Sequence, residues 1–380
     1  MFGVGGLSLV FGLTTAWIVT RYNFFGKKFF EWMLLLPAAV PAYIIAYTYT
    51  DFFEYAGPLQ SLLRDIFGWT SSKDYWFPNV RSMGGAILVM SSVLYPYVYL
   101  MTRASFITTP ISFFQTSSIY GRNSFFNVAI PFGRPGIIAG LALVLMETIS
   151  DFGTVDYFAI ETLTLGVFNV WLGMNSLSGA SQISSILFMI VIVLLTLEYL
   201  GRRSRKFHEK YSGASYTPTQ TVSGIKNSLL FLICLIPLSL GFIIPVSILL
   251  NFVIKGYSII NFIEIFQITL SSISLAFISS SFIMLLSLLM IIVGAYKSNN
   301  FQKILIFFAS SGYAFPGTIL AVGIVVFVGW LNDLIYFRMS YAVGGFIILL
   351  FAYSIRFLAV GNGAITVSYT HLTLPTKVTV

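Results

Sequence analysis

The acidic side chains after residue 146 are the first candidates for chemistry, because they follow an apolar segment directly. Glu147 and Asp151 lie four residues apart, so a helix places both carboxylates on one face. Asp156, Tyr157 and Glu161 follow in a stretch without Lys or Arg. Carboxylate oxygens near a tyrosine suit a hard cation, and an acidic surface attracts cations. The stretch predicts a cation pathway or, as the plainer alternative, acids that are solvated or paired with an arginine of a neighbouring helix.

Other catalytic or metal-binding patterns do not occur in the sequence. It contains no G-x-x-x-x-G-K-[ST] phosphate-binding loop, and its two histidines, His208 and His371, are not at metal-ligand spacing. Cys234 is the one cysteine, and no Ser-His-Asp or Cys-His set can be assembled. We expect no enzymatic activity, no cofactor and no firmly assigned metal site, so any ATP hydrolysis must occur in a separate subunit.

The elements that position the acids are apolar segments of membrane-crossing length. Of the 380 residues, 57% are hydrophobic and 9% are charged, and the mean hydropathy is +0.89. This composition excludes an ordinary soluble domain and predicts an all-α, polytopic membrane protein. About nine crossing segments are expected, namely the opening segment before Arg21 and residues 32–53, 83–102, 136–150, 183–200, 228–252, 268–296, 304–330 and 341–360.

The positive charges predict the orientation of these segments. The net charge is +8, but the Lys and Arg residues lie in short gaps between apolar runs, which is typical of membrane topology rather than of nucleic-acid binding. Basic gaps at residues 21–30, 103–134 and 201–210 alternate with balanced or acidic gaps at 54–82 and 151–182. Positive gaps face the cytoplasm, so Met1 is expected outside and residues 201–227 inside.

The chain is expected to contain two similar halves. Residues 1–200 form the first, the polar stretch 201–227 is a cytoplasmic linker that contacts membrane lipid, and 228–365 form an incomplete second half. LLLPAAVPAYIIA around Pro41 matches ASSGYAFPGTILA around Pro316, and the GGAILVMSSVLYPY and GGFIILLFAYSIRF runs also match. Each proline breaks or kinks a membrane helix. Paired breaks indicate the transport pathway or, alternatively, kinks that serve only helix packing.

A short amphipathic segment, Gln115 to Arg134, interrupts the apolar runs and is expected to lie as helices along the membrane surface. Gly121 lies where a turn between two short helices needs conformational freedom. Pro131 is expected to end the pattern. The segment carries Arg122 but no acid, so it is assigned to the cytoplasm.

This segment resembles the EAA loop of binding-protein-dependent ABC importer permeases. The match consists of a residue triplet, a glycine and an Ile-Pro pair at the family's spacing: Gln115, Thr116, Ser117, Gly121, Ile130 and Pro131. Gln-Thr-Ser replaces the family's Glu-Ala-Ala, so the spacing matches and the triplet does not. METISDFGTVDYF, TAWIVTRYNFFGKKFFEWMLLLPAAVPAYIIAYTYTDFFEYAGP and GGAILVMSSVLYPYVYLMTRA are similar to ferric-iron importer permeases, and the similarity runs from about Leu7 to Gly363.

The resemblance implies a bacterial inner-membrane subunit that imports ferric iron. Its loop 115–134 would be the coupling helix that docks on an ABC ATPase subunit, and a periplasmic binding protein would deliver the substrate. Glu147, Asp151, Asp156 and Tyr157 match the family's pathway pattern. Related permeases for thiamine, phosphonates or polyamines share much of this similarity. An ion-coupled secondary transporter also uses repeats and broken helices.

The matched halves predict that the C-terminal end of the permease is missing, and the abrupt apolar start predicts that a helix is missing at the front as well. Gly344 lies 260 residues after Gly84, so a second coupling loop is expected near residue 375. Residues 366–380, TVSYTHLTLPTKVTV, are instead polar and rich in β-formers. We expect this tail to be foreign or artefactual.

Overall fold

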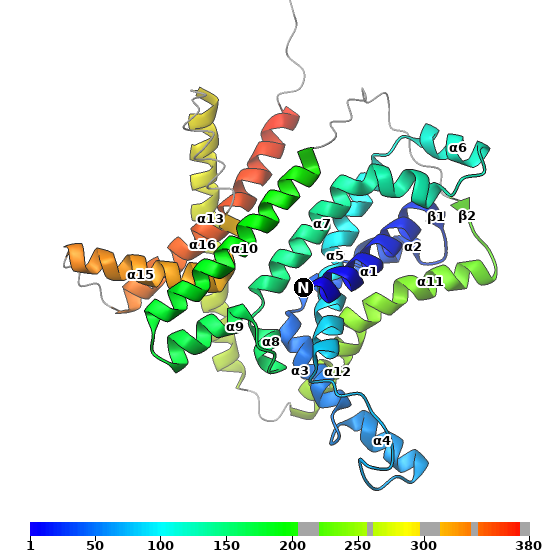
Figure 1. Cartoon of the computed structure of the whole chain (residues 1–380), viewed down its shortest axis with the longest axis horizontal. Coiled ribbons are helices and arrows are strands. Elements are labelled where there is room, and N and C mark those ends of the chain that lie inside the picture. The colour runs from blue at the N-terminus through cyan, green and yellow to red at the C-terminus, as the bar shows by residue number, and fades with distance from the viewer. Residues whose placement is uncertain (204–219, 257–260, 297–311, 336–340, 373–380) are drawn as a thin grey trace, which may run out of the picture. The chain divides into compact units, whose positions relative to one another are not determined.

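The computed structural model describes residues 1–203, 220–256, 261–296, 312–335 and 341–372. The chain is all-α apart from one pair of two-residue strands, so far as these residues show. It forms two compact units, residues 1–166 with 192–257 and residues 167–191 with 258–380. The boundary between the units passes through α9 and α10, which are shown with the other elements in Figure 1.

The first unit is built mainly from α1, α5 and α7, which pack together in the order α1, α5, α7. Its elements are α1 (Phe2–Arg21), β1 (Tyr22–Asn23), α2 (Lys27–Met33), η1 (Leu36–Ala39), α3 (Ala42–Phe53), α4 (Pro58–Phe67), α5 (Met83–Ile107), α6 (Ile111–Ile119), η2 (Phe125–Ala129), α7 (Ile130–Ser150), α8 (Gly153–Tyr157), β2 (Gln220–Thr221), α11 (Ile225–Leu238), η4 (Ser239–Ile243) and α12 (Ile244–Gly256).

Glycines let these three helices approach closely around Val98 of α5. A Cβ added at Gly12 of α1 would lie 2.6 Å from the Val98 Cβ, and one added at Gly140 of α7 would lie 2.7 Å from the Val98 Cα. Buried Tyr95 and Tyr99 fill the neighbouring turns of α5. Small residues at such contacts are the usual means by which membrane helices pack, since lipid supplies no hydrophobic driving force between them.

The strands close one end of this unit. β1 and β2 pair in parallel, with Tyr22 opposite Gln220 and Asn23 opposite Thr221. The backbone N–H of Phe25 also donates to Oδ1 of Asn227 at 2.8 Å. Residues after α1 and residues before α11 therefore lie together, as expected for two gaps that were both assigned to the cytoplasm. We call the end with β1, β2 and α6 the inner end, and the end with α8 and α4 the outer end (Figure 1).

The second unit is organised around the long helices α13 and α16. Besides parts of α9 (Leu163–Phe168) and α10 (Leu177–Arg203), it contains η3 (Asn169–Gly173), α13 (Phe262–Tyr296), η6 (Gly312–Ala314), α15 (Gly317–Ile335) and α16 (Tyr341–Leu372). α16 packs on α13 and on η6, and it contacts α15. A small cluster of Val167, Ala180 and Val322 joins α9, α10 and α15.

Seven helices of the described residues are long and apolar enough to cross a membrane, where about nine crossings were expected. The expected crossing at 32–53 is a pair of helices bent by 89° between Ala39 and Ala42, and counting that pair gives eight. The expected crossing at 304–330 begins outside the described residues, and its described part is a shorter apolar helix, Gly317–Leu331. The protein is an all-α, multi-pass membrane protein.

The expectation that Pro131 ends a surface helix is wrong. The helix that contains Pro131 starts at Ser124 and forms one crossing segment from Phe125 to Ser150, not from residue 136. Residues 125–129 form a π-turn in which the Ile130 N–H donates to the Phe125 carbonyl. This wider turn accommodates a proline that would disrupt a regular helix. Only α6 remains as a separate short helix.

The C-terminal tail also differs from its prediction. α16 continues to Leu372, so residues 366–372 are helical rather than extended, and residues 373–380 lie outside the described part. A long helix that is already formed extends at low cost through residues of weak helix propensity. The two compact units divide the chain differently from the predicted halves, since residues 225–256 pack within the first unit. Compactness does not measure internal similarity, so the duplication itself remains a prediction.

Candidate functional site

The turn after α6 lies at the inner end and is closed by two hydrogen bonds between Ser117 and Arg122. The Arg122 N–H donates to the Ser117 carbonyl at 2.9 Å, and Ser117 Oγ donates to the Arg122 carbonyl at 3.1 Å. Gly121 has a φ of +63°, which is the left-handed conformation that its predicted role in a turn requires. We call residues 117–123 the inner turn. Its two hydrogen bonds make it a closed structure rather than a loose connection.

Asn123 fixes the start of the next helix. Its Oδ1 accepts from the Phe125 N–H at 2.9 Å, and its carbonyl accepts from the Asn127 N–H at 3.0 Å. Asparagine is among the preferred residues for capping the free N–H groups at a helix start. The Asn123-Ser124 pair before an apolar run is the sequence signal for this helix start.

Aromatic side chains anchor α6 and the inner turn to the helix bundle. The Trp17 ring of α1 lies 6.0 Å from Phe106, 6.2 Å from Phe114 and 5.3 Å from Phe125, measured between ring centroids. The ring of Phe114 is buried and lies under the Arg21 guanidinium at 4.9 Å. Such contacts stabilise beyond the area they bury. The position of α6 is therefore coupled to α1, α5 and the start of α7.

The end of α6 and the inner turn form an exposed, partly apolar surface. Ile119 is 82% exposed and Tyr120 is 75% exposed, and Arg122 follows them. Exposed apolar residues bordered by a positive charge are typical of a protein interface. Of the predicted coupling residues, Gln115, Thr116 and Gly121 are exposed here. Ser117 is buried, and Ile130 and Pro131 are half-buried within α7.

The outer end of α7 carries the predicted acids. Asp151 follows the last residue of α7, and its carboxylate accepts from the Thr154 N–H at 2.9 Å and from Thr154 Oγ1 at 3.0 Å. Burial raises the pKa of the Asp151 carboxyl, and the negative charge of Glu147 adds to this effect. Thr164 Oγ1 donates to the Ile149 carbonyl at 2.6 Å, so the chain folds back over the helix end.

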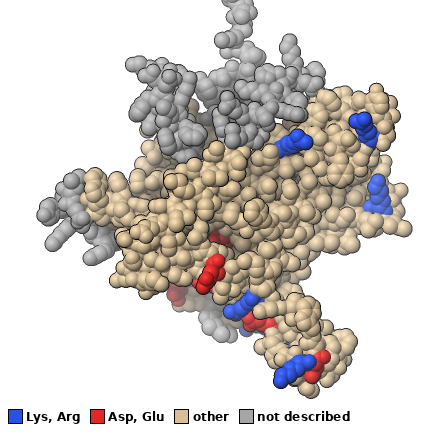
Figure 2. Space-filling view, in the orientation of Figure 1, with Lys and Arg blue, Asp and Glu red and all other residues tan. Residues whose placement is uncertain are grey.

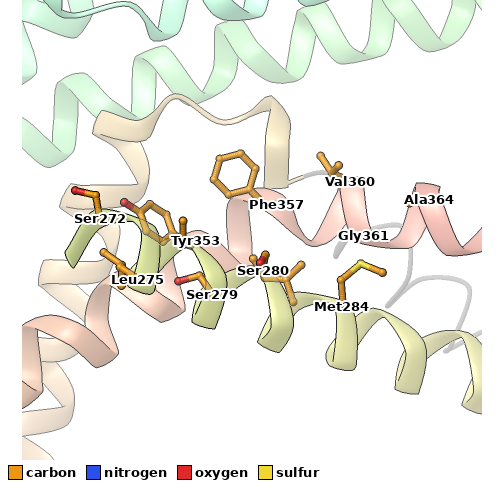
Figure 3. A pocket seen from close by; sticks show the side chains of 12 residues that line it. Ser272, Leu275, Ser279, Ser280, Met284, Tyr353, Phe357, Val360, Gly361 and Ala364 are labelled. Carbon is orange, nitrogen blue, oxygen red and sulfur yellow. The ribbon is translucent and has the colours of Figure 1, made fainter. Parts of the chain in front are cut away.

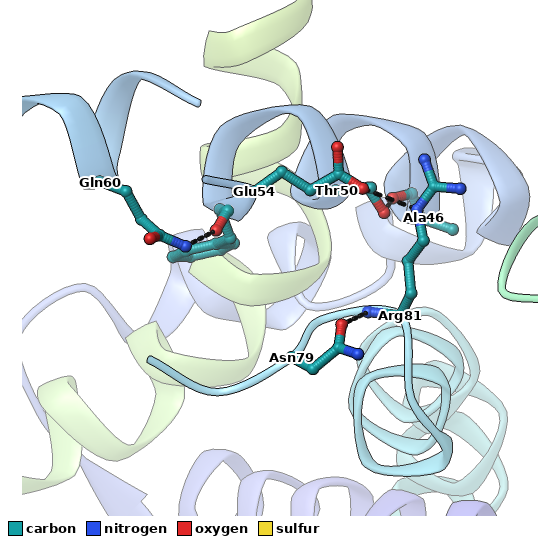
Figure 4. Close-up of polar contacts among 7 residues, drawn as sticks. Ala46, Thr50, Glu54, Gln60, Asn79 and Arg81 are labelled. Carbon is teal, nitrogen blue, oxygen red and sulfur yellow. Dashed lines mark hydrogen bonds and ion pairs between the residues drawn. The ribbon is translucent and has the colours of Figure 1, made fainter. Parts of the chain in front are cut away.

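Tyr157 lies in a cluster that the sequence did not predict. The Arg81 guanidinium lies 5.1 Å from the centre of its ring. Figure 4 shows the ion pair of Arg81 with Glu54, in which Arg81 Nε lies 2.7 Å from Glu54 Oε1. The Tyr47 ring lies 6.1 Å from the Tyr157 ring. Asp156 is exposed, while Glu147 is half-buried. Arg81 comes from the connection before α5, so only the tertiary structure brings a positive charge to this acidic end.

The two predicted prolines have the same local setting. Pro41 follows η1 and precedes α3, and Pro316 follows η6 and precedes α15. In each unit the 3-10 helix contacts the long helix that comes later, η1 with α5 and η6 with α16. Pro41 is exposed, whereas Pro316 is buried. Each proline begins a helix instead of kinking its interior, and their part in a pathway remains a prediction.

α7 connects the two sets of predicted residues in the first unit. Pro131 lies near its inner end and Glu147 near its outer end, about 24 Å apart at 1.5 Å per residue. Figure 2 shows basic side chains over the inner end, near α6, and acidic side chains toward the outer end, where they mix with basic ones near α4. A single helix therefore connects the segment after the inner turn to the acidic end.

The second unit holds a cavity of about 550 Å³ between α13 and α16 (Figure 3). Ser272, Ser279, Ser280 and Tyr353 bring hydroxyl groups to its otherwise apolar wall. The Ser279 hydroxyl is buried and has no hydrogen-bond partner among the residues that the structure describes. The serine-rich run at residues 271–281, SSISLAFISSS, is the sequence signal for this cavity.

Within the described residues, no three His, Cys, Asp or Glu side chains converge as metal ligands. No family model matches the chain. The Fe(3+)-transport system permease protein FbpB 2 of Haemophilus influenzae is 25% identical over 87% of this chain and 62% of its own length. The Molybdenum transport system permease protein ModB of the same species is 28% identical over 52% of this chain and 88% of its own length. The Sulfate transport system permease protein CysT of Escherichia coli is 26% identical over 49% of this chain and 67% of its own length.

The chain resembles ABC importer permeases. The permeases it resembles are transport components by name, in agreement with the predicted class. The chain spans 62% of the length of the ferric-iron permease, so the activity, substrate and partners of a whole permease are proposals for it.

Proposed function

We propose that the chain is the membrane-spanning subunit of an ATP-driven importer in the bacterial inner membrane. A periplasmic binding protein delivers ferric iron at the outer end, and a separate ATPase subunit binds α6 and the inner turn. Closure of the ATPase on ATP moves α6, and α7 transmits the movement to the outer end. No resident cofactor is needed for this role.

The exposed face of α6 carries this proposal. Ile119, Tyr120 and Arg122 form a partly apolar, positively charged surface at the end of α6 and in the inner turn, and α6 is anchored to three membrane helices through Trp17. Such a surface can bind a partner and pass on a force, because the side of α6 that faces the helix bundle is held in place while the opposite side is exposed.

The acidic outer end supports ferric iron as the substrate. Asp151, Asp156 and Glu161 lie at or after the end of α7, and their carboxylates suit a hard cation in transit. The positive charge of Arg81 is paired with Glu54 at 2.7 Å, so it is partly neutralised. The relative that covers most of this chain is also named as a ferric-iron permease.

An oxyanion is the second candidate substrate, because the molybdenum and sulfate permeases match about half of this chain. An oxyanion pathway needs hydrogen-bond donors or positive charge, and the outer end of the first unit is instead mainly acidic. Thiamine and polyamines are cations that the acidic outer end would also attract, so the loaded binding protein that stimulates the complex decides between them and ferric iron, whereas a phosphonate is an anion like the oxyanions. An ion-coupled secondary transporter would bury acids near the middle of a crossing helix, whereas Glu147 and Asp151 lie at the end of α7.

The test is ATPase activity of the full natural permease, purified in lipid with the ATPase encoded beside it. We expect ferric-loaded binding protein to stimulate ATP hydrolysis severalfold over the iron-free protein. Replacing both Ile119 and Tyr120 by serine should abolish the stimulation, because the apolar contact with the ATPase is lost. The matched control is Phe25→Ser, since Phe25 is a 75% exposed aromatic residue at the inner end outside α6.

Each other outcome corrects a different part of the proposal. Stimulation by a molybdate- or sulfate-loaded binding protein would keep the ATP-driven class and replace the substrate. Failure of any ATPase to associate with the wild-type protein would favour a secondary transporter. Equal effects of the α6 variant and of Phe25→Ser would remove α6 as the specific contact.

A further inference from the structure

A second cavity lies at the inner end of the first unit, beside the inner turn. Its volume is about 490 Å³, and it is lined by Thr14, Trp17, Ile18, Arg21, Tyr22, Asn123, Ser124, Phe125, Gln220, Leu230 and Ile233. These residues come from α1, β1, the inner turn, the start of the α7 crossing, β2 and α11. Three crossing segments begin or end here, Phe2–Arg21, Phe125–Ser150 and Ile225–Gly256, so the cavity lies at the level of the lipid headgroups.

The lining changes from polar to apolar along the helices. Arg21, at the end of α1, gives way to Ile18 and Thr14 one and two turns deeper on the same face. Leu230 and Ile233 follow in the same direction on α11. The wall therefore suits a molecule with a polar head at the membrane surface and an apolar tail that points into the bilayer.

The polar part of the cavity is positive. The Arg21 guanidinium rests on the Phe114 ring, and the two ion pairs found among the described residues, Arg81–Glu54 and Arg103–Glu31, do not include it. No Asp or Glu lines the cavity. Lys226 adds a second positive charge nearby, with its Nζ 4.9 Å from the centre of the Tyr22 ring. Half-buried positive charge without an acid partner favours an anionic ligand.

We propose that this cavity binds the anionic phosphate headgroup of a membrane phospholipid, with one acyl chain lying along Ile18, Leu230 and Ile233. Arg21 donates to the phosphate, and Asn123, Ser124 and Gln220 supply neutral polar groups around it. Asn123 also caps the helix after the inner turn, so a bound headgroup stabilises the turn that presents α6. An effect of the lipid on ATP-driven transport rests on the proposed function, whereas lipid binding itself does not.

Lipid binding to the full natural protein tests this assignment. The protein is purified in neutral detergent and titrated with phosphatidylglycerol, phosphatidylcholine or inorganic phosphate, while bound lipid is counted by native mass spectrometry and thermal unfolding is followed. We expect saturable binding and stabilisation by phosphatidylglycerol alone. Arg21→Gln should weaken phosphatidylglycerol binding about tenfold, because a charge-assisted hydrogen bond is lost.

Two further variants complete the design. Arg134→Gln removes an exposed arginine that does not line the cavity, so lipid affinity should be unchanged. Ile233→Trp fills the apolar part while leaving Arg21 in place, and it should also weaken binding if Arg21→Gln fails to fold. Equal binding of phosphatidylcholine, full stabilisation by inorganic phosphate alone, or equal losses in Arg21→Gln and Arg134→Gln would each overturn the proposal.

Discussion

Gly121 and Asp74 illustrate how single residues determine local structure at the two ends of the first unit. Gly121 has a positive φ and open space around it, because no atom lies within 4 Å of where its Cβ would be. Asp74 is exposed, and its carboxylate accepts from the N–H groups of Thr70 and Ser71 at 2.9 and 2.8 Å. Backbone conformation determines the role of Gly121, and the negative charge of the carboxylate determines the role of Asp74.

Replacing Gly121 by valine should disrupt the inner turn without any steric clash. A β-branched residue at positive φ costs about 1–2 kcal/mol, whereas asparagine tolerates this conformation. We expect Gly121→Val to reduce binding-protein-stimulated ATP hydrolysis and Gly121→Asn to retain most of it, measured in the purified complex. Equal loss in both variants would show that the side chain at this site, rather than the backbone angle, matters.

The Asp74 carboxylate should make the connection before α5 sensitive to acid. Hydrogen bonds from the Ser71 and Thr70 backbone hold the pKa of this carboxyl below its usual 3.8. A lowered pKa means that the carboxylate stabilises the folded connection above the unfolded pKa, and that this stabilisation is lost as the pH falls through the folded pKa.

Hydrogen exchange of residues 68–76, corrected for intrinsic rates, measures this effect. Protection should fall below about pH 4 in the wild type. In Asp74→Ala protection should be low at every pH. Asp65→Ala removes an exposed acid on α4 and should keep the wild-type profile. A wild-type profile in Asp74→Ala would contradict the assigned role.

Two features determine how α7 is built and placed. One is its close packing with α1 and α5, and the other is the π-turn that precedes it. Gly12 and Gly140 allow both outer helices to approach Val98. The π-turn at residues 125–129 lets one helix continue through Pro131, so α7 links the inner turn to Asp151 without a break. A rigid connection between the two ends depends on both features.

Replacing Gly140 by leucine should push α7 away from α5. The new side chain would meet the Val98 Cα, and backbone cannot move aside as a flexible side chain can. Overpacking costs typically about 1–3 kcal/mol, so we expect a lower apparent melting temperature of the purified protein. Gly6→Leu is the matched control, because no atom lies within 4 Å of a Cβ at Gly6. An equal decrease in both variants would contradict this packing.

At the scale of the whole molecule, the charges of the first unit predict its orientation in the membrane. Residues after α1, α6 and β2 lie at the inner end, where the basic gaps were expected, and α4 and α8 lie at the outer end (Figure 1). The positive-inside rule therefore predicts that Lys28 faces the cytoplasm and that Lys73 faces the outside. Both side chains are exposed, and the single native cysteine, Cys234, is buried.

Cysteine labelling in intact cells tests this orientation. Lys73→Cys should react with a membrane-impermeant maleimide in spheroplasts, whereas Lys28→Cys should react only after the membrane is opened, because the reagent cannot cross it. The wild-type protein should stay unlabelled, since its thiol is buried. The reverse labelling pattern would invert the assignment of the inner and outer ends.

The sequence by itself determined the class of this protein and the general position of its inner turn. Long apolar runs and the charges between them are local properties, so they predict helices, membrane location and orientation without tertiary contacts. The turn at Gly121 was predicted for the same reason, because only its own backbone angle is involved.

The tertiary structure alone decided which distant residues meet. Arg81 lies over Tyr157, Tyr22 pairs with Gln220, and Trp17 anchors α6, although each pair is far apart in the chain. Pro131 was misjudged because a proline's effect depends on the geometry of the preceding turn, which hydrophobic periodicity does not reveal. Contacts of this kind arise from side-chain packing in three dimensions between residues that are far apart along the sequence.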